Sequence, residues 1–442
     1  MFSRALLALA WLSLTSVLAG CTGNGLLSRL TIAPSPRQQY ADSLRAAALA
    51  DTAIARDWLR AGEESLQRPL SIALPLRESG YFAADQPTAT AYQFELVRGR
   101  RLAVEIVFDS VEATQLFVDL FLVRDPEPPD RVASAPDGGT LTYDVPSDGT
   151  YVLRVQPELL RSGRYTIVQR TLASLRFPVT GLTASAVQSE FGAARDAGRR
   201  EHEGIDIFAA RNTPVVAVVD GTAQPGSNAL GGNVVWLRGR GVRRSFYYAH
   251  LTRPAFEDTR PVQAGEVVGY VGNTGNARTT APHLHFGIYE GGAIDPLPFL
   301  QADDPVPGGA PDAAGWLSEM VRVTAARATL RAGTGRAAPA VAQLDRASLG
   351  RVVGVAATQV RVMLPDRSTG YLDRSALAVA TSALRRQRLA PGVIVREKPV
   401  GDGPAVRTID EATTADVFGE FNGFALIGTS SGAAGWIEMT RP

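Results

Sequence analysis

The spacing of apolar residues changes several times along the chain. From Ser35-Pro36 they recur with a rough helical period, and a capping hydroxyl followed by proline favours a helix start, so a helix is expected from there to near Gly62. Over residues 70–172, short runs such as "RLAVEIVF" and "DGTYVLRV" alternate or are continuously apolar, separated by Gly, Pro and Asp. This second pattern predicts a β-sandwich.

The remaining chain is also strand-rich. Residues 301–316, rich in Pro, Gly and Asp, read as a linker. The tail repeats itself at an offset of 65 residues, since "GYLD" at Gly370 returns as "GWIE" at Gly435. We therefore expect a mainly β, multidomain chain with these parts: signal peptide 1–20, linker and helix 21–69, β-sandwich 70–172, histidine-bearing domain 173–300, linker 301–316, and tail modules 317–381 and 382–442.

The amino terminus has the features of an export signal. Arg4 precedes a short apolar run at residues 5–17, which is below the roughly 20 residues of a spanning helix. The run ends in "LAGC" at Cys21, the sole cysteine. This pattern resembles a bacterial lipoprotein signal, cut before a cysteine whose acyl chains anchor the protein to a membrane. We expect lipidation of Cys21 and export to the cell envelope, with Thr22 favouring the outer membrane where there is one. The alternative is an ordinary signal peptide with a chance cysteine.

The chain has a net charge of +1, so no overall field favours nucleic acid. Its four histidines all fall between residues 202 and 285. His283 and His285 lie in a strand-like run, where residues two apart point the same way with Cα atoms about 6.6 Å apart. Both imidazoles are therefore expected to face one cleft.

His202 and Asp206 are four residues apart, about 13 Å in a straight strand and too far to share one ion. Gly204 is poor helix material but supplies the freedom for a turn that would close the pair. Together with one histidine of the His283/His285 pair they make three ligands, the number typical of catalytic zinc with one position left for water. His250 and the remaining histidine could take the water's proton and stabilise an oxyanion. An inert zinc site would normally have four ligands, often cysteines, and no second cysteine is available.

Three segments, "HEGID", "YYAHL" and "APHLHFGIY", resemble the signature of the lysostaphin-like zinc endopeptidases, which cut peptide cross-links of bacterial peptidoglycan. The similarity covers roughly residues 191–300. It implies an antiparallel β domain of the duplicated hybrid motif type with a groove over the metal. It also implies Zn²⁺ bound by His202, Asp206 and His285, with catalytic roles for His250 and His283.

The flanking regions carry weaker resemblances. The sandwich is similar to prepeptidase carboxy-terminal accessory domains, and the tail modules are similar to bacterial SH3-like barrels. Such modules could bind wall polymers or act only as packing and spacing. The basic segment "RDAGRRE" before His202 is expected to be a solvated loop or to line the groove.

The sequence thus predicts a zinc-dependent endopeptidase that acts on peptidoglycan stem peptides or cross-bridges and is anchored through Cys21. The alternative is a non-catalytic wall-binding scaffold that activates a separate amidase, although such relatives typically lose metal ligands. A lipoyl-type carrier, suggested by "EVVGYVGNTG", is excluded because the only lysine, Lys398, lies far from that hairpin. The bond that is cut stays open between polyglycine bridges and direct cross-links involving a D-amino acid.

Overall fold

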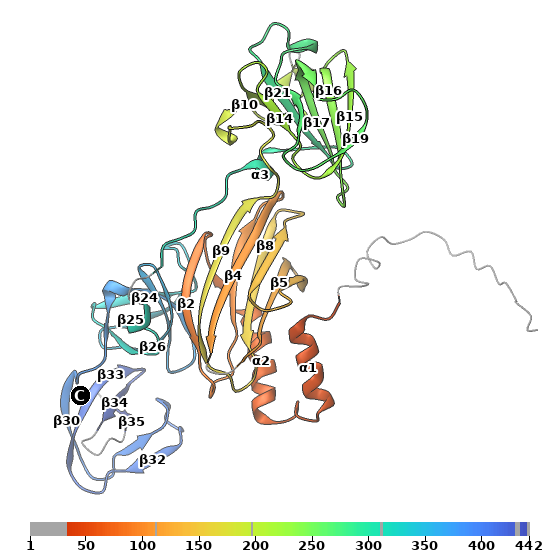
Figure 1. The fold of residues 1–442 in the computed structure, drawn as a ribbon. Helices are drawn as coiled ribbons and strands as arrows, with labels where there is room; N and C mark the ends of the chain where they lie inside the picture. Colours follow the sequence, from red (N-terminus) through yellow and green to blue (C-terminus); the bar gives the residue numbers. More distant parts are fainter. Residues whose placement is uncertain (1–32, 111–112, 196–197, 310–312, 429–433, 440–442) are drawn as a thin grey trace, which may run out of the picture. The chain divides into compact units, whose positions relative to one another are not determined.

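A computed structural model describes residues 33–110, 113–195, 198–309, 313–428 and 434–439 (Figure 1). The fold is mainly β and built from several sheets, as expected. Cys21, the predicted lipidation site, lies outside these residues. Among the residues described, no helix is both long enough and apolar enough to cross a membrane.

Two helices stand where one was expected: α1 (Pro36–Ala46) and α2 (Ala53–Gln67). The Ser35 hydroxyl caps the first helix by accepting a hydrogen bond from the Gln38 amide at 3.2 Å, and Thr52 caps the second. Between them the chain turns through Ala48, whose φ is 57°. The single-helix prediction was wrong because the apolar period runs on across this break. The break is marked only by the second capping residue.

The β-sandwich consists of two facing groups of strands over a shared apolar core. One sheet contains, in spatial order, β1 (Leu70–Ser71), β3 (Thr90–Leu96), β8 (Gly149–Pro157), β5 (Leu116–Arg124) and β6 (Glu127–Ser134). The other group contains β2 (Leu76–Phe82), β9 (Gly163–Ala173), β4 (Arg100–Ser110) and β7 (Thr140–Asp144). The two helices lie against the first sheet, where the Trp58 indole donates to the carbonyl oxygen of Pro157 at 2.8 Å.

The first tail unit continues the second of these sheets. Its strands are β23 (Met320–Val323), β24 (Arg327–Arg331), β25 (Ala340–Asp345), β26 (Leu349–Ala356), β27 (Gln359–Met363), β28 (Thr369–Asp373) and β29 (Leu377–Val379). Strand β26 pairs with β2, with Ser79 opposite Val355 and Gly80 opposite Gly354, which gives one sheet of 11 strands. The sequence pattern had not predicted this pairing.

The second tail unit forms its own sheet of six strands. These are β30 (Arg385–Leu389), β31 (Ile394–Arg396), β32 (Ala405–Thr408), β33 (Thr413–Phe421), β34 (Phe424–Gly428) and β35 (Ala434–Glu438). Register irregularities fall at matching places in the two units, at Val352/Gly354 and Val417/Gly419. The repeat seen in the sequence is therefore also a repeat of strand pairing.

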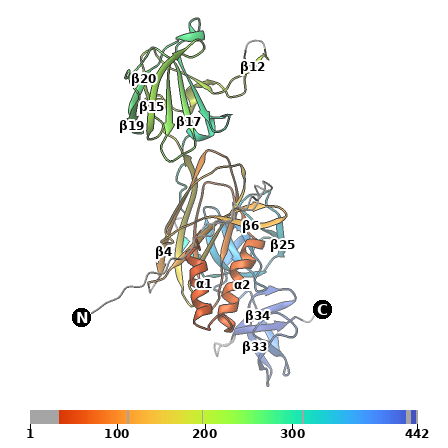
Figure 2. The ribbon, with the colours of Figure 1, turned by 90° about the vertical axis from the view of Figure 1, so that its right-hand side faces the viewer.

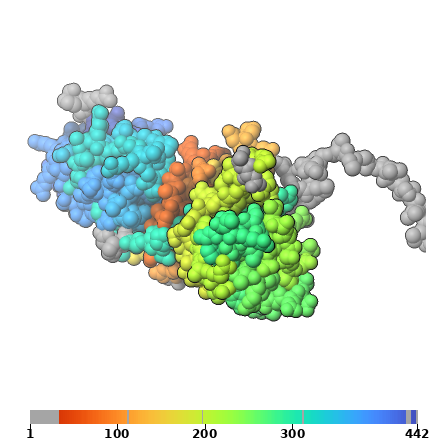
Figure 3. Space-filling view, turned by 90° about the horizontal axis from the view of Figure 1, so that it is seen from above, coloured from red at the N-terminus to blue at the C-terminus, as the bar shows by residue number. Residues whose placement is uncertain are grey.

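The histidine-bearing region is built on an eight-stranded antiparallel sheet (Figures 1 and 2). Its order is β10 (Val187–Ser189), β13 (Ile205–Phe208), β21 (His283–Tyr289), β17 (Ser245–Leu251), β16 (Gly232–Gly239), β15 (Gly221–Asn228) and β19 (Arg260–Val262), with β22 (Ala293–Ile294) beside β21. A smaller sheet holds β14 (Pro214–Val216), β20 (Val267–Tyr270) and β18 (Arg253–Pro254). The hairpin β11 (Ala194–Arg195) and β12 (Arg200–Glu201) precedes β13, and α3 (Leu297–Leu300) ends the region, whose surface is green in Figure 3.

One face of this sheet forms the core of the region. On β21 the side chains of Leu284, Phe286 and Ile288 are fully buried in that core. Successive strand residues point to opposite faces, so His283 and His285 lie on the other face. The alternation along "HLHFGIY" therefore places both imidazoles on the same side of the sheet.

Candidate metal centre

Strand register brings the candidate ligands together. Asp206 on β13 is the direct partner of His285 on β21. His202 lies four residues before Asp206, just ahead of β13, where the chain bends back toward the sheet. At Gly204 an added Cβ would lie 2.5 Å from the Phe286 carbonyl oxygen and 2.8 Å from the His285 ring. Glycine is therefore needed there because the backbone approaches so closely, and Gly204 is not among the glycines with a positive φ.

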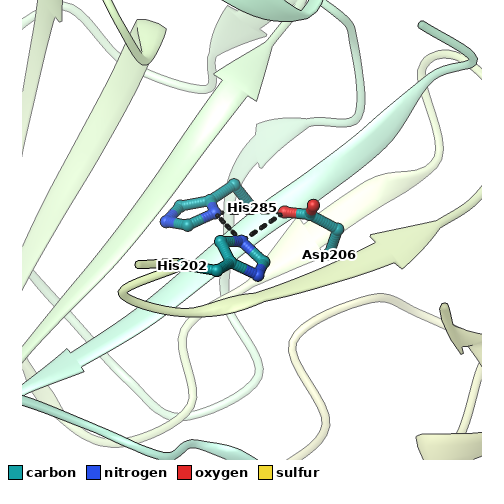
Figure 4. Close-up of side chains that lie close together, drawn as sticks. All are labelled: His202, Asp206 and His285. Carbon is teal, nitrogen blue, oxygen red and sulfur yellow. Dashed lines mark hydrogen bonds and ion pairs between the residues drawn. The ribbon is translucent and has the colours of Figure 1, made fainter. Parts of the chain in front are cut away.

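Three donor atoms converge on one point (Figure 4). The Nε2 atom of His202 lies 3.0 Å from Oδ1 of Asp206 and 2.9 Å from Nδ1 of His285. The Nδ1 atom of His285 lies 3.1 Å from the same carboxylate oxygen. Ligand atoms about 2.1 Å from a tetrahedral ion lie roughly 3.4 Å apart, so these separations fit a zinc-sized cation. Two nitrogens and one carboxylate oxygen are also a donor set found in catalytic zinc sites.

Backbone carbonyls orient the other sides of the histidine rings. The Nδ1 atom of His202 lies 2.8 Å from the Glu190 carbonyl, that of His250 lies 3.0 Å from Thr274, and that of His283 lies 2.9 Å from Ala281. A carbonyl only accepts, so each Nδ1 carries the proton in the neutral ring and each Nε2 keeps its lone pair. The contacts thus prepare His202 to bind a metal and leave His250 and His283 able to accept a proton.

His250 and His283 lie beside the three ligands. The ring centroids of His250 and His283 are 5.0 Å apart, and those of His250 and His285 are 5.9 Å apart. Both side chains are mostly buried. The backbone of His250 has a φ of 61°, a conformation that a non-glycine residue rarely adopts and that clusters at functional sites.

Burial and neighbouring charges set the protonation states. Burial, together with the nearby His283 and His285, lowers the pKa of His250 to about 4. Burial also lowers the pKa of His285. For Asp206, burial raises the pKa, but the closeness of the His202 and His285 rings lowers it by more, so the pKa falls well below the usual range. At neutral pH the site therefore presents a carboxylate and a neutral His250 able to accept a proton.

Arg195 is a site residue that sequence reasoning missed. Its Nη2 donates to Oδ2 of Asp206 at 2.8 Å and to the Ser189 hydroxyl at 2.6 Å. It belongs to the segment "RDAGRRE", for which only a solvated or groove-lining loop was predicted. The sequence could have indicated such a residue through Asp206 itself, because a buried carboxylate that gives one oxygen to a metal needs a hydrogen-bond donor for the other.

Comparison with known proteins agrees with this geometry. Residues 200–296 match the model of Peptidase family M23. This part of the chain is an M23 peptidase domain. The chain is 36% identical over 142 residues to the L-Ala–D-Glu endopeptidase of Bacillus subtilis (strain 168), covering 28% of this chain and 43% of that protein. It is 38% identical over 109 residues to lysostaphin of Staphylococcus simulans, covering 23% of this chain and 22% of lysostaphin.

Among solved structures, the M23 domain is similar to the catalytic domain of lysostaphin from Staphylococcus simulans. That match has 32% identity and a TM-score of 0.24, and covers 26% of this chain and 94% of the other. The chain spans less than half the length of the curated relatives named above.

Proposed function

We propose that the protein is a zinc-dependent endopeptidase that hydrolyses peptide cross-links of bacterial peptidoglycan. The observation that carries the proposal is the convergence of His202, Asp206 and His285 on one point, with His250 and His283 alongside. The M23 domain and its similarity to endopeptidases support the same class of reaction.

The chain's own residues account for the proton transfers. A bound zinc ion would supply a Lewis acid that polarises the scissile carbonyl and acidifies a water molecule. Neutral His250 accepts the water's proton at Nε2, because its Nδ1 is held by Thr274. Once protonated, such a nitrogen becomes a donor that can protonate the departing amine. The water oxygen bonds to the carbonyl carbon and the carbon–nitrogen bond breaks, without a covalent enzyme intermediate.

His283 serves the oxyanion in this scheme. Its Nε2 faces the ligand cluster, 4.0 Å from Oδ1 of Asp206. The neutral ring carries its proton on Nδ1, so Nε2 would donate to the developing negative charge of the tetrahedral intermediate after it takes up a proton from solvent. His250 and His283 thus provide the proton transfer and the oxyanion stabilisation that a hydrolase needs.

The location of the enzyme is part of the proposal. Export and lipidation of Cys21 would hold it at the envelope side of a membrane, the outer membrane where there is one. The two tail units, as SH3-like modules, would bind or approach the wall. The scaffold alternative is less well supported, because all three metal ligands are present.

The decisive test removes one ligand. Replacement of Asp206 by alanine should abolish bound zinc and reduce wall hydrolysis by at least about 100-fold, because a three-ligand site loses its only anionic ligand. Zinc is measured by elemental analysis of the purified protein, and the products of wall digestion by mass spectrometry. The exposed Asp258 of the same domain, changed to alanine, is the matched control and should retain both properties. Full hydrolysis by the Asp206→Ala variant would refute the assignment.

A further inference from the structure

A partly exposed aromatic surface lies on the sheet face that carries the candidate metal ligands. It consists of Trp236 on β16, Tyr247 on β17 and Tyr289 on β21, here called the aromatic row. Trp236 is the strand partner of Tyr247, and Tyr247 is the partner of Gly287, which stands between His285 and Tyr289. Strand partners share a face, so the aromatic row is on the same side as His285.

The row is continuous with the metal site. The ring centroids of Trp236 lie 4.5 Å from Tyr247 and 5.3 Å from Tyr289, and the Tyr247 ring lies 6.0 Å from that of His285. Trp236 is 39% exposed, whereas Trp58 and Trp436 are 1% and 7% exposed. Its indole adds little to the core, which lies on the opposite face of the sheet.

Polar contacts hold the row in place. The Asn228 amide donates to the Tyr247 hydroxyl at 3.0 Å, and the Tyr289 hydroxyl donates to the Glu203 carboxylate at 3.5 Å. Gly287 contributes no side chain between the two tyrosines. The result is an aromatic surface of rings tilted to one another, by 39° between Trp236 and Tyr247, with Gly287 between the two tyrosines and an amide and a carboxylate beside them.

The aromatic row offers a larger apolar contact surface than the peptide part of the substrate needs. The name of the Bacillus subtilis relative specifies alanine and glutamate at the bond that it cuts, which have a small and a polar side chain. A sugar ring, in contrast, offers an apolar face of C–H groups the size of an aromatic ring, with hydroxyl and amide groups around its edge. Its face would stack on Trp236, and its edge would meet Asn228 and Glu203.

The distance from the metal site also fits a sugar. Trp236 lies two strands away from His285, or about 10 Å at the usual strand spacing. About three residues of extended peptide cover this distance. In the wall, the stem peptide is attached to the glycan strand at one end, so a sugar on Trp236 would leave a bond two or three residues along the stem at the metal site.

We propose that the aromatic row is a subsite for an amino-sugar ring of the glycan strand. This inference rests on the proposed peptidoglycan hydrolysis and adds the part of the substrate that is recognised. It favours cleavage of a direct cross-link, close to the stem peptide, over cleavage of a bond in a longer polyglycine bridge.

The test compares two soluble cross-linked substrates with the same peptides, one attached to its disaccharides and one with the sugars removed. For the full-length zinc-loaded enzyme, the KM should be roughly 3- to 10-fold lower for the substrate with sugars. Replacement of Trp236 by alanine should bring the ratio of the two KM values to about one. Replacement by phenylalanine should keep part of the difference.

Tyr270 gives the matched control, because it stacks on Arg253 in the smaller sheet of the same domain. The Tyr270→Ala variant should keep the preference for the substrate with sugars. Equal KM values in the unaltered enzyme, or a preference that survives in Trp236→Ala, would overturn the subsite. If the unaltered enzyme cleaves neither substrate nor intact wall, the proposed function itself has failed.

Discussion

The two oxygens of the Asp206 carboxylate have different partners. Oδ1 faces the ring nitrogens of His202 and His285, whereas Oδ2 accepts a hydrogen bond from Arg195. This division leaves one oxygen free to bind a metal and holds the carboxylate in a fixed orientation. The Arg195 guanidinium thus orients the Asp206 carboxylate and is not itself a candidate ligand.

Loss of that contact should weaken metal binding. We expect Arg195→Ala to lower zinc affinity by about 10- to 100-fold, the usual effect of removing the partner of a metal ligand. Competition with a zinc chelator measures the affinity directly and does not depend on activity. Arg195→Lys should recover part of it, since an ammonium donates but lacks the fixed geometry of the guanidinium. Arg243→Ala removes an exposed arginine of the same domain and should leave the affinity unchanged; an equal loss there would point to overall charge as the cause.

Among structural elements, the pair β13 and β21 supplies two of the three candidate ligands and part of the core. The sequence predicted this arrangement for β21, because "HLHFGIY" alternates between polar and apolar positions. The sequence also predicted a bend between His202 and Asp206, but it attributed the need for glycine there to backbone freedom. Gly204 is required by the close approach of β21, which depends on a neighbouring strand that no local pattern reveals.

Gly204→Ala should therefore damage the site. The added methyl group would meet the Phe286 carbonyl and the His285 ring, so β13 and β21 must move apart. We expect a loss of about 1–3 kcal/mol in stability, as for other overpacked positions, together with weaker zinc binding. Thermal unfolding and zinc content measure these effects. Gly226→Ala, on β15 of the same sheet, is the control, because its Cβ would come no closer than 3.8 Å to its nearest neighbour. Similar losses in both variants would contradict the steric explanation.

The whole molecule contains a connection that the sequence did not indicate. Strand β2 carries Glu78 at an inward position of the alternation between Leu76 and Phe82, where its carboxylate is fully buried. Arg361 of the first tail unit lies 3.0 Å from it, and the hydroxyls of Tyr92 and Tyr371 donate to it. A strand charge is normally read as exposed, so this ion pair and the β2–β26 pairing could not be derived from local periodicity.

Removal of Arg361 should be costly. Arg361→Met leaves the Glu78 carboxylate buried without its cationic partner, and the expected loss is about 3–5 kcal/mol. Urea unfolding of the full chain measures it. Replacing both residues by apolar ones, as in Glu78→Leu with Arg361→Met, should recover much of the loss. The exposed pair Arg327 and Asp345 is the control, because Arg327→Ala should change stability by less than about 1 kcal/mol. A small effect of Arg361→Met would show that the buried pair does not couple the two parts.

The two tail copies differ at the position that makes this connection. Arg361 in the first copy corresponds to Leu426 in the second at the same offset of 65 residues. Dividing the chain at the Pro/Gly-rich segment before residue 317 would separate Arg361 from Glu78. One fragment would then expose the Arg361 cation and the edge of β26, and the other would keep the Glu78 carboxylate without its partner. A cut near residue 381, between the copies, keeps that connection intact but removes Phe421, Phe424 and Trp436 from the buried cluster that they share with the first copy.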